Sequence, residues 1–309
     1  TMSFLKNPGR RVVGIGSALI DVLAQVTDDF LTDVSDVKGG MTLVENDFIH
    51  HVTRRLAGTP DIVPGGATCN TMIGIGKLGG DSAFVGQCGD DDLGRLFEEG
   101  LIQSGVKPRL FKSNTPTGRV LSLITPDAQR SMFTYLGASA EMDPESIMTE
   151  FFHEASVVMI EGYLVFNQTL MMASLDAAKK ANASIALDLA SFTVVESSRD
   201  FIMENVVDHV DILIANEDEA RAYTGETDPG RALAVLQRGV RLVVSADAHR
   251  ASDLHNLAYA VANEHIRLLA PILSFTAEEL WEVFRPGKDD SVFFQSLNRN
   301  KKSLTLDLK

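Results

Sequence analysis

Short apolar segments rich in β-branched residues alternate along the chain with longer amphipathic segments, and this alternation constrains the fold more than any other feature. The short segments have the length of buried strands, and the segments between them have the spacing of helices. A strand–helix–strand order makes consecutive strands parallel and places helices on both faces of the sheet. We therefore expect a three-layer α/β/α sandwich with a mostly parallel sheet. The expected strands are 11–15, 82–85, 156–160, 185–189, 212–215 and 240–244, and the expected helices are 67–78, 93–104, 169–180, 201–207, 217–223 and 231–238.

Two regions depart from this order. In residues 21–44 and 117–136, polar and apolar side chains alternate, as they do in antiparallel strands that expose one face to water. We expect these strands to form a small lid beside the main sheet.

The charge balance limits the partners of the chain. Its formal net charge is -14, and such a field repels the phosphates of nucleic acids and of anionic membranes. We therefore expect no nucleic acid and no membrane as a partner. Two cysteines are too few for a disulfide framework, and no apolar run is long enough to span a bilayer. The composition predicts a soluble, cytoplasmic enzyme.

The end of the first strand is the first candidate ligand site. The string GIGS at 14–17 begins like a dinucleotide-binding fingerprint, but Leu19 stands where the third glycine belongs, so we set that cofactor aside. Asp21 follows near the carboxyl end of the strand, where parallel sheets place ligands. Alone, it would be interpreted as a turn or capping carboxylate.

The string PGGATCN at 64–70 strengthens this candidate. It places Gly65 and Gly66 at a helix start and Asn70 one turn further on. Glycine lets the backbone approach a ligand closely, and the free N–H groups of a helix start can bind hydroxyls or anions. Asn70 can donate and accept, which suits a ligand with adjacent hydroxyls. The string VGQCGDDDLG at 85–94 then adds a glycine turn and an acidic helix start.

The order and spacing of these motifs resemble the ribokinase-like, or PfkB-type, carbohydrate kinase family, and within it the adenosine-kinase-like branch. The resemblance covers about residues 1–243. It implies a phosphotransferase that moves phosphate from ATP, with Mg²⁺, to a hydroxyl of a small-molecule sugar or nucleoside. It also implies lid strands near 21–44 and 112–136 and a homodimer formed through the lid. The motifs that carry it are GIGSALID at 14–21, GGM at 39–41, GGATCN at 65–70, VGQCGDDDLG at 85–94, QRS at 129–131 and NEDE at 216–219.

The same resemblance implies roles for individual residues. The acceptor would be bound by Asp21, Gly39, Gly40, Gly65, Gly66, Asn70 and Arg130, the last of these from the lid. Asn216 and Glu219 would lie near the transferred phosphate, and Glu219 would orient a water on Mg²⁺. Apart from the resemblance, the charged residues at 217–221 would be interpreted as an exposed helix face. Asp188, at the end of another expected strand, is a lesser candidate.

Residues 244–309 depart from the family, and we expect an atypical, mainly helical segment in place of the usual nucleotide-binding part. In the family, a late motif D-T-x-G-A-G-D supplies an anion hole and the catalytic base, and no such string occurs here. The catalytic base is therefore left unassigned, and turnover is expected to be impaired. The main alternative is a non-catalytic or chimeric scaffold that keeps the acceptor pocket.

Short strings in this last part resemble other families. Residues 245–250 resemble PHP-type phosphoesterases, 267–281 the anticodon-binding region of class I aminoacyl-tRNA synthetases, and 296–309 class III CoA-transferases. A metal-dependent hydrolase using Asp247, His249 and His255 is a remote alternative, because these residues lack the further ligands that a hydrolytic metal cluster needs.

Overall fold

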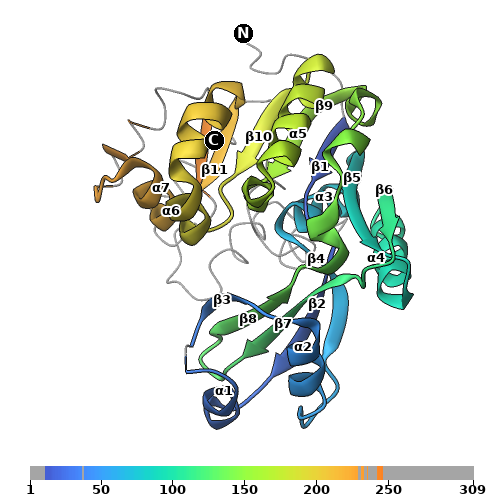
Figure 1. Ribbon diagram of the computed structural model, residues 1–309, viewed down its shortest axis with the longest axis vertical. Coiled ribbons are helices and arrows are strands. Elements are labelled where there is room, and N and C mark those ends of the chain that lie inside the picture. The colour runs from blue at the N-terminus through green and yellow to red at the C-terminus, as the bar shows by residue number, and fades with distance from the viewer. Residues whose placement is uncertain (1–10, 37, 229–230, 233–234, 236–241, 246–309) are drawn as a thin grey trace, which may run out of the picture.

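The computed structural model describes residues 11–36, 38–228, 231–232, 235 and 242–245, and Figure 1 shows its architecture. Within these residues, a seven-stranded parallel sheet has the strand order β12-β11-β10-β9-β1-β5-β6. The predicted α/β fold with a mostly parallel sheet is confirmed. The strands are β1 (Arg11–Ile15), β5 (Ser82–Gly89), β6 (Val106–Ser113), β9 (Ala155–Glu161), β10 (Ser184–Asp188), β11 (Ile212–Ala215) and β12 (Leu242–Ser245).

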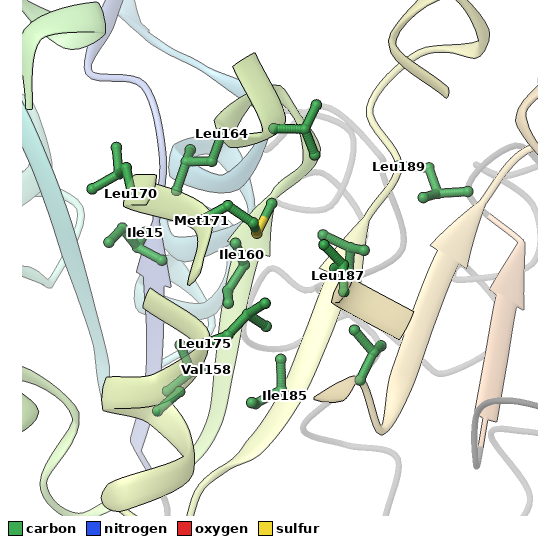
Figure 2. Packing of buried hydrophobic residues seen from close by; sticks show 14 of the residues in the cluster. Ile15, Val158, Ile160, Leu164, Leu170, Met171, Leu175, Ile185, Leu187 and Leu189 are labelled. Carbon is green, nitrogen blue, oxygen red and sulfur yellow. The ribbon is translucent and has the colours of Figure 1, made fainter. Parts of the chain in front are cut away.

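Alternate side chains of the central strands enter two different cores. Val12 of β1 belongs to the core on one face of the sheet, and Val13 belongs to the core on the other face. This two-residue period explains why the strands are apolar throughout, since both faces are covered. Figure 2 shows part of the second core, which includes Ile160 of β9, Leu187 of β10 and Leu175 of α5.

Five α-helices flank this sheet in the described part of the chain. Core residues of α3 and α4 pack on the first face, and those of α5 and α6 on the second. The helices are α3 (Ala67–Lys77), α4 (Asp92–Gln103), α5 (Gln168–Lys180), α6 (Phe192–Phe201) and α7 (Glu217–Thr224). Short 3₁₀ turns lie at Gly137–Glu141, Pro144–Ser146, Thr149–Phe152, Gly162–Phe166 and Val207–His209, and a π-helical turn at Ile202–Val206.

A second sheet of five strands lies at one end of the first, in the order β3-β8-β7-β2-β4 (Figure 1). Its hydrophobic core is continuous with the first face of the main sheet. Its elements are β2 (Leu19–Gln25), β3 (Gly40–Leu43), β4 (Asp61–Gly65), β7 (Gly118–Ile124) and β8 (Arg130–Tyr135), with α1 (Asp28–Val34) and α2 (Asn46–Thr53) beside them.

The expected antiparallel pairing of residues 21–44 with 117–136 is wrong at the centre of this sheet. β2 and β7 pair in parallel, while the antiparallel pairs are β7–β8 and β2–β4. The reason is topological: β1 and β6 are parallel strands of the first sheet, and the chain leaves their carboxyl ends to form β2 and β7. Both strands therefore start at the same edge and run in the same direction.

Three further expectations need correction. The helix predicted at 201–207 is the end of a longer helical segment, because α6 begins after Ser191, whose hydroxyl caps it. α1 interrupts the region expected to be strands, since Thr27 caps it and accepts the Phe30 N–H. No strand was predicted at β4, which contains Pro64; a proline is tolerated there because β4 is an edge strand.

The predicted helix at 231–238 falls largely outside the described residues, as does the segment 244–309 beyond Ser245. In the described part, no helix has the length and apolar character needed to cross a membrane.

Candidate functional site

The carboxyl ends of three neighbouring strands bring polar side chains together. Glu161 ends β9, Asp188 ends β10, and Asn216 follows β11. The strand register pairs Asp188 directly with Glu161. This edge is where a parallel sheet presents loops and helix starts to a ligand, so we take it as the candidate site.

Glu161 is the most deeply buried carboxylate of this edge, with 1% of its surface exposed. Its Oε1 accepts the backbone N–H of Ser17 at 3.3 Å, and its Oε2 accepts that of Thr68 at 3.4 Å. Burial raises the pKa of Glu161 to about 7, although hydrogen bonds from Ser17 and Thr68 oppose the rise. Sequence reasoning missed this residue. An acid directly after a buried strand, followed by Gly162, was the available signal.

Asp21 lies on β2 against the backbone of β4. A Cβ atom on Gly65 would come within 2.3 Å of the Asp21 carboxylate, so only glycine leaves room for the acid. Burial raises the pKa of Asp21 to about 6, and the positive charge of Arg130 opposes the rise. Burial also raises the pKa of the Cys69 thiol, with Glu161 and Asp21 adding to it. The two acids therefore flank the first turn of α3.

The start of α3 has an unusual backbone. Gly66 has a φ of +99°, and α3 has no side-chain cap at this end. A Cβ atom on Gly66 would lie 2.5 Å from the Ser17 carbonyl oxygen. Asn70 follows one turn later, where its backbone N–H bonds to the Gly66 carbonyl and its side chain is partly exposed. The structure thus brings together Asp21, Gly65, Gly66 and Asn70.

The second sheet places the remaining expected acceptor-binding residues, Gly39, Gly40 and Arg130, at the start of neighbouring strands. Gly39 and Gly40 have φ values of +84° and +74°. The Gly39 N–H donates to Ser131 Oγ at 2.8 Å, and Gly40 pairs with Ser131, the residue after Arg130.

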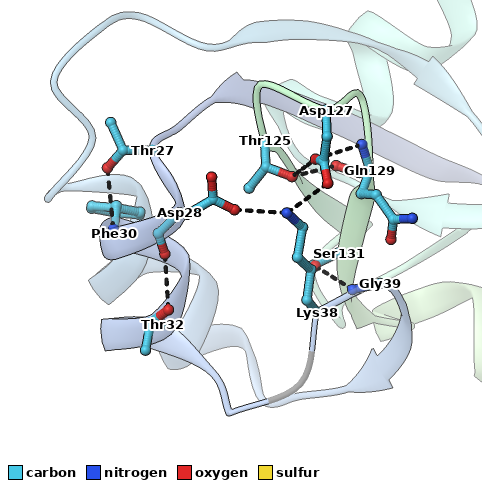
Figure 3. A network of polar contacts seen from close by, with 10 residues as sticks. All are labelled: Thr27, Asp28, Phe30, Thr32, Lys38, Gly39, Thr125, Asp127, Gln129 and Ser131. Atoms are coloured by element: carbon cyan, nitrogen blue, oxygen red, sulfur yellow. Dashed lines mark hydrogen bonds and ion pairs between the residues drawn. The ribbon is translucent and has the colours of Figure 1, made fainter.

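Lys38 ties this glycine pair to two other elements (Figure 3). Its Nζ lies 2.6 Å from Asp28 of α1 and 2.8 Å from Asp127 in the turn between β7 and β8. These ion pairs, with the Gly39–Ser131 bond, fix the chain at the entry to β3.

Asn216 and Glu219 form a capping box at the start of α7. Asn216 Oδ1 accepts the Glu219 N–H at 2.8 Å, while the Glu219 carboxylate accepts the backbone N–H and the side-chain amide of Asn216, both at 2.9 Å. Glu219 is only 4% exposed, so the interpretation of 217–221 as a uniformly exposed face is wrong for this residue. Asp218 and Arg221 do form an exposed ion pair.

Tyr163 is influenced by carboxylates from both ends of the candidate site. Burial raises its pKa to about 12, and the charges of Glu161, Asp188 and Glu219 add to the rise. These three carboxylates therefore act on one phenol. Among the described residues, no group of three or more His, Cys, Asp or Glu side chains could hold a metal ion. Asp247, His249 and His255 lie outside that part of the chain.

The protein is an α/β/α sandwich. It carries an acidic, glycine-lined candidate site at the carboxyl ends of its parallel strands, and this fold and site define its structural class. The family model described as pfkB family carbohydrate kinase matches residues 37–252, and the chain belongs to this family. The resemblance drawn from the motifs is confirmed, and the match continues beyond residue 243. A second model, described as the anticodon-binding domain of tRNA ligase, matches residues 241–308, a longer stretch than the 267–281 resemblance.

Individual relatives agree with the family assignment. The guanosine-inosine kinase of Escherichia coli K12 is 29% identical over 232 residues, which cover 71% of this chain and 54% of that protein. The probable fructokinase-7 of Arabidopsis thaliana is 30% identical over 57% of this chain and 54% of its own length. The chain spans about half the length of the curated relatives it matches.

Solved structures share the fold. The adenosine kinase from Sinorhizobium meliloti superposes with a TM-score of 0.71 at 31% identity, covering 77% of this chain and 74% of that one. A probable sugar kinase from Rhizobium etli CFN 42 has the same TM-score and coverage at 27% identity.

Proposed function

We propose that this chain binds a nucleoside or sugar at the carboxyl edge of its sheet and belongs to a phosphotransferase that uses ATP and Mg²⁺. One observation carries the proposal: Asp21 lies against Gly65, and both Asp21 and the buried Glu161 act on Cys69, the residue before Asn70. A carboxylate, an amide and free helix-start N–H groups are the partners that adjacent hydroxyls need. Gly39, Gly40, Gly66 and Arg130 complete the proposed acceptor site.

The charge state of Asp21 suits this role. With a pKa of about 6, most of its carboxylate is ionised at neutral pH and accepts hydrogen bonds from hydroxyls. Asn70 can accept from one hydroxyl and donate to its neighbour. The pair would therefore favour a ligand with two adjacent hydroxyls, such as a ribose.

The names of the relatives favour a nucleoside over a free sugar as the first acceptor to test. A guanosine-inosine kinase and an adenosine kinase are both similar to this chain, the second with a TM-score of 0.71. Fructokinases are also among the relatives, so fructose belongs in the same test.

The opposite end of the edge would face the nucleotide phosphates through Asn216 and Glu219. Asn216 donates to both Glu219 oxygens and so fixes the orientation of the carboxylate. As the family resemblance implies, Glu219 would act on Mg²⁺ through a bound water, which suits an ion that keeps several waters. When bound, Mg²⁺ would neutralise charge on the phosphates.

The missing D-T-x-G-A-G-D string supports a second candidate function. Loss of a single oxyanion donor costs on the order of 3 kcal/mol of transition-state stabilisation in enzymes. A chain without both hole and base would bind an acceptor and turn it over poorly. This non-catalytic binding scaffold differs from the first candidate only in turnover, which radiolabelled ATP would measure as phosphorylated product.

We also propose a cytoplasmic homodimer formed through the second sheet. The edge strand β4 exposes Ile62 and Val63 by 44% and 40%, and an apolar sheet edge favours pairing with another chain. Light scattering should give twice the chain mass, and Ile62→Lys should return it to that of one chain.

Calorimetric titration tests the binding function directly. The protein is titrated with Mg-ATP and then with guanosine, inosine, adenosine and fructose. Asn70→Ala should weaken binding of the acceptor by about tenfold, the equivalent of about 1.4 kcal/mol, and leave Mg-ATP binding unchanged. Asn205→Ala, at an exposed site in the π-helical turn, is the matched control. Binding of none of the four acceptors would refute the proposed acceptor site.

A further inference from the structure

Glu161 joins two segments that lie far from it in the sequence. Ser17, just past β1, is 144 residues away, and Thr68, in the first turn of α3, is 93 residues away. Each segment leads into proposed acceptor residues, since Asp21 follows Ser17 on β2 and Asn70 follows Thr68 on α3. The position of Glu161 is therefore coupled to both halves of that site.

The Glu161 carboxylate replaces the missing cap of α3. A helix start leaves backbone N–H groups without partners inside the helix, and a side chain at the cap position normally accepts one of them. Gly66 holds that position and has no side chain, whereas Glu161 accepts the Thr68 N–H. A negative charge at a helix start is also favoured by the helix dipole.

Two glycines make this arrangement possible. A Cβ atom on Gly16 would lie 2.5 Å from Glu161 Oε2, and one on Gly66 would lie 2.5 Å from the Ser17 carbonyl oxygen. These two positions leave no room for a side chain. The end of β1, the start of α3 and the end of β9 therefore pack closely around the Glu161 carboxylate.

We propose that Glu161 is a positioning residue whose ionised carboxylate holds the start of α3 against the end of β1, and that its protonation releases this contact. The inference rests on the proposed function only where it concerns acceptor affinity. An ionised carboxylate accepts hydrogen bonds at both oxygens, whereas a protonated one turns one oxygen into a donor. One of the two backbone N–H groups then faces a neutral hydroxyl oxygen, which is a weaker acceptor than a carboxylate oxygen.

The surroundings of Glu161 place this change near neutral pH. Burial is the largest influence on its pKa, which is about 7. The polar and titratable groups that face it are Ser17 after β1, Thr68 and Cys69 of α3, Asp188 of β10, Tyr163 after β9 and, through Cys69, Asp21 of β2. Asp21 has a pKa of about 6, so its own titration must be separated from that of Glu161.

Glu161→Gln provides this separation because glutamine imitates the protonated acid at every pH. Asp211→Asn is the matched control, since Asp211 is also a buried carboxylate that accepts a backbone N–H, that of Ile185 at 3.0 Å. Asp211 precedes β11 and therefore lies at the amino ends of the strands, whereas Asp188 lies at their carboxyl ends.

The experiment follows the backbone amide resonances of Ser17 and Thr68 in the full chain, without ligand, from pH 5.5 to 8. In the wild-type protein both should titrate with one midpoint near 7, and their hydrogen-exchange protection should increase with pH. Asp211→Asn should behave in the same way, whereas Glu161→Gln should abolish both changes. Amides that do not titrate in the wild type would overturn the proposal, whether or not the variant folds.

Guanosine titration over the same pH range then tests the effect on the acceptor. The ratio of wild-type to Glu161→Gln affinity should grow from near unity at pH 5.5 to roughly tenfold at pH 8, the effect of one charged hydrogen bond. A constant ratio would refute the control of acceptor affinity. Titrating amides without guanosine binding would instead refute the proposed acceptor and leave the positioning role of Glu161 intact.

Discussion

Glu161 and Glu219 lie at the same edge of the sheet, and both are almost fully buried, but they are held in opposite ways. Glu219 is bonded by Asn216, three residues away on the same helix start. Glu161 is bonded by two segments 144 and 93 residues away. The capping box can form as soon as its helix does, whereas the contacts of Glu161 require the whole sheet.

The difference shows how each half of the site depends on the rest of the fold. The part near α7 is a local structure that is carried on one helix. The part near α3 is a junction of three segments, in which glycines permit close backbone approach. Substitutions at the junction should therefore lower the free energy of unfolding more than substitutions at the capping box.

The largest loss of stability is expected for Gly66→Ala. Its φ of +99° and the 2.5 Å approach to the Ser17 carbonyl oxygen combine backbone strain with a clash that no side-chain rotation relieves. We expect the free energy of unfolding to fall by about 3 kcal/mol, measured by urea denaturation.

Gly40→Ala is the matched control for this prediction. Gly40 also has a positive φ, of +74°, but a Cβ atom there would meet nothing within 4 Å. Its loss should be about 1 kcal/mol, the conformational cost alone. Equal losses in the two variants would show that the contact with Ser17 contributes nothing.

A somewhat smaller effect is expected from the ionisation of Glu161. Its pKa is about 7 in the folded chain and near 4.5 when unfolded, so the folded chain binds this proton more tightly. The stability from this group is complete below pH 4.5 and is lost as the pH rises through 7. Between pH 5 and 8, Glu161→Gln should therefore gain about 2 kcal/mol relative to the wild type.

This gain in stability should accompany a loss of acceptor affinity at pH 8. A merely structural role for Glu161 would move stability and affinity in the same direction. Urea denaturation at several pH values, set beside the guanosine titrations, distinguishes the two cases.

Breaking the capping box should cost less. Asn216→Ala removes the side-chain acceptor of the Glu219 N–H and the side-chain amide donor to the Glu219 carboxylate, and it leaves the backbone N–H donor in place. We expect a loss of about 1 kcal/mol in the free energy of unfolding. Thr27→Ala, which removes the cap of α1, is the comparison, and a larger loss there would contradict the importance of the buried partner Glu219.

The smallest effect is expected from Lys38→Met, which removes the ion pairs to Asp28 and Asp127. These charges are exposed and screened by salt. The urea midpoint should fall slightly at low ionic strength and match the wild type in 1 M salt. A difference that persists in high salt would mean that Lys38 acts through packing and not through charge.

Much of this architecture could be predicted from local sequence. The apolar segments 11–15 and 212–215 coincide with β1 and β11, and the helix start at 67 coincides with that of α3. Both patterns arise from residues that are close in the sequence, so they can be recognised without the tertiary structure.

The predictions from sequence were wrong where the structure depends on residues that are far apart in the chain. The parallel pairing of β2 with β7 depends on how both strands leave the first sheet. β4 depends on an edge position that tolerates Pro64. Glu161 was missed because its bonding partners are distant in the chain, and an acid after a buried strand has many local interpretations.

The sequence by itself determined the layered α/β fold and the glycine pair at the start of α3, because strand and helix periodicity and the backbone preferences of glycine act over a few residues. Only the tertiary structure decided that Gly65 lies against Asp21 and that Glu161 holds Ser17 to Thr68. Those contacts join segments whose approach costs loop entropy and is repaid only when the complete core forms.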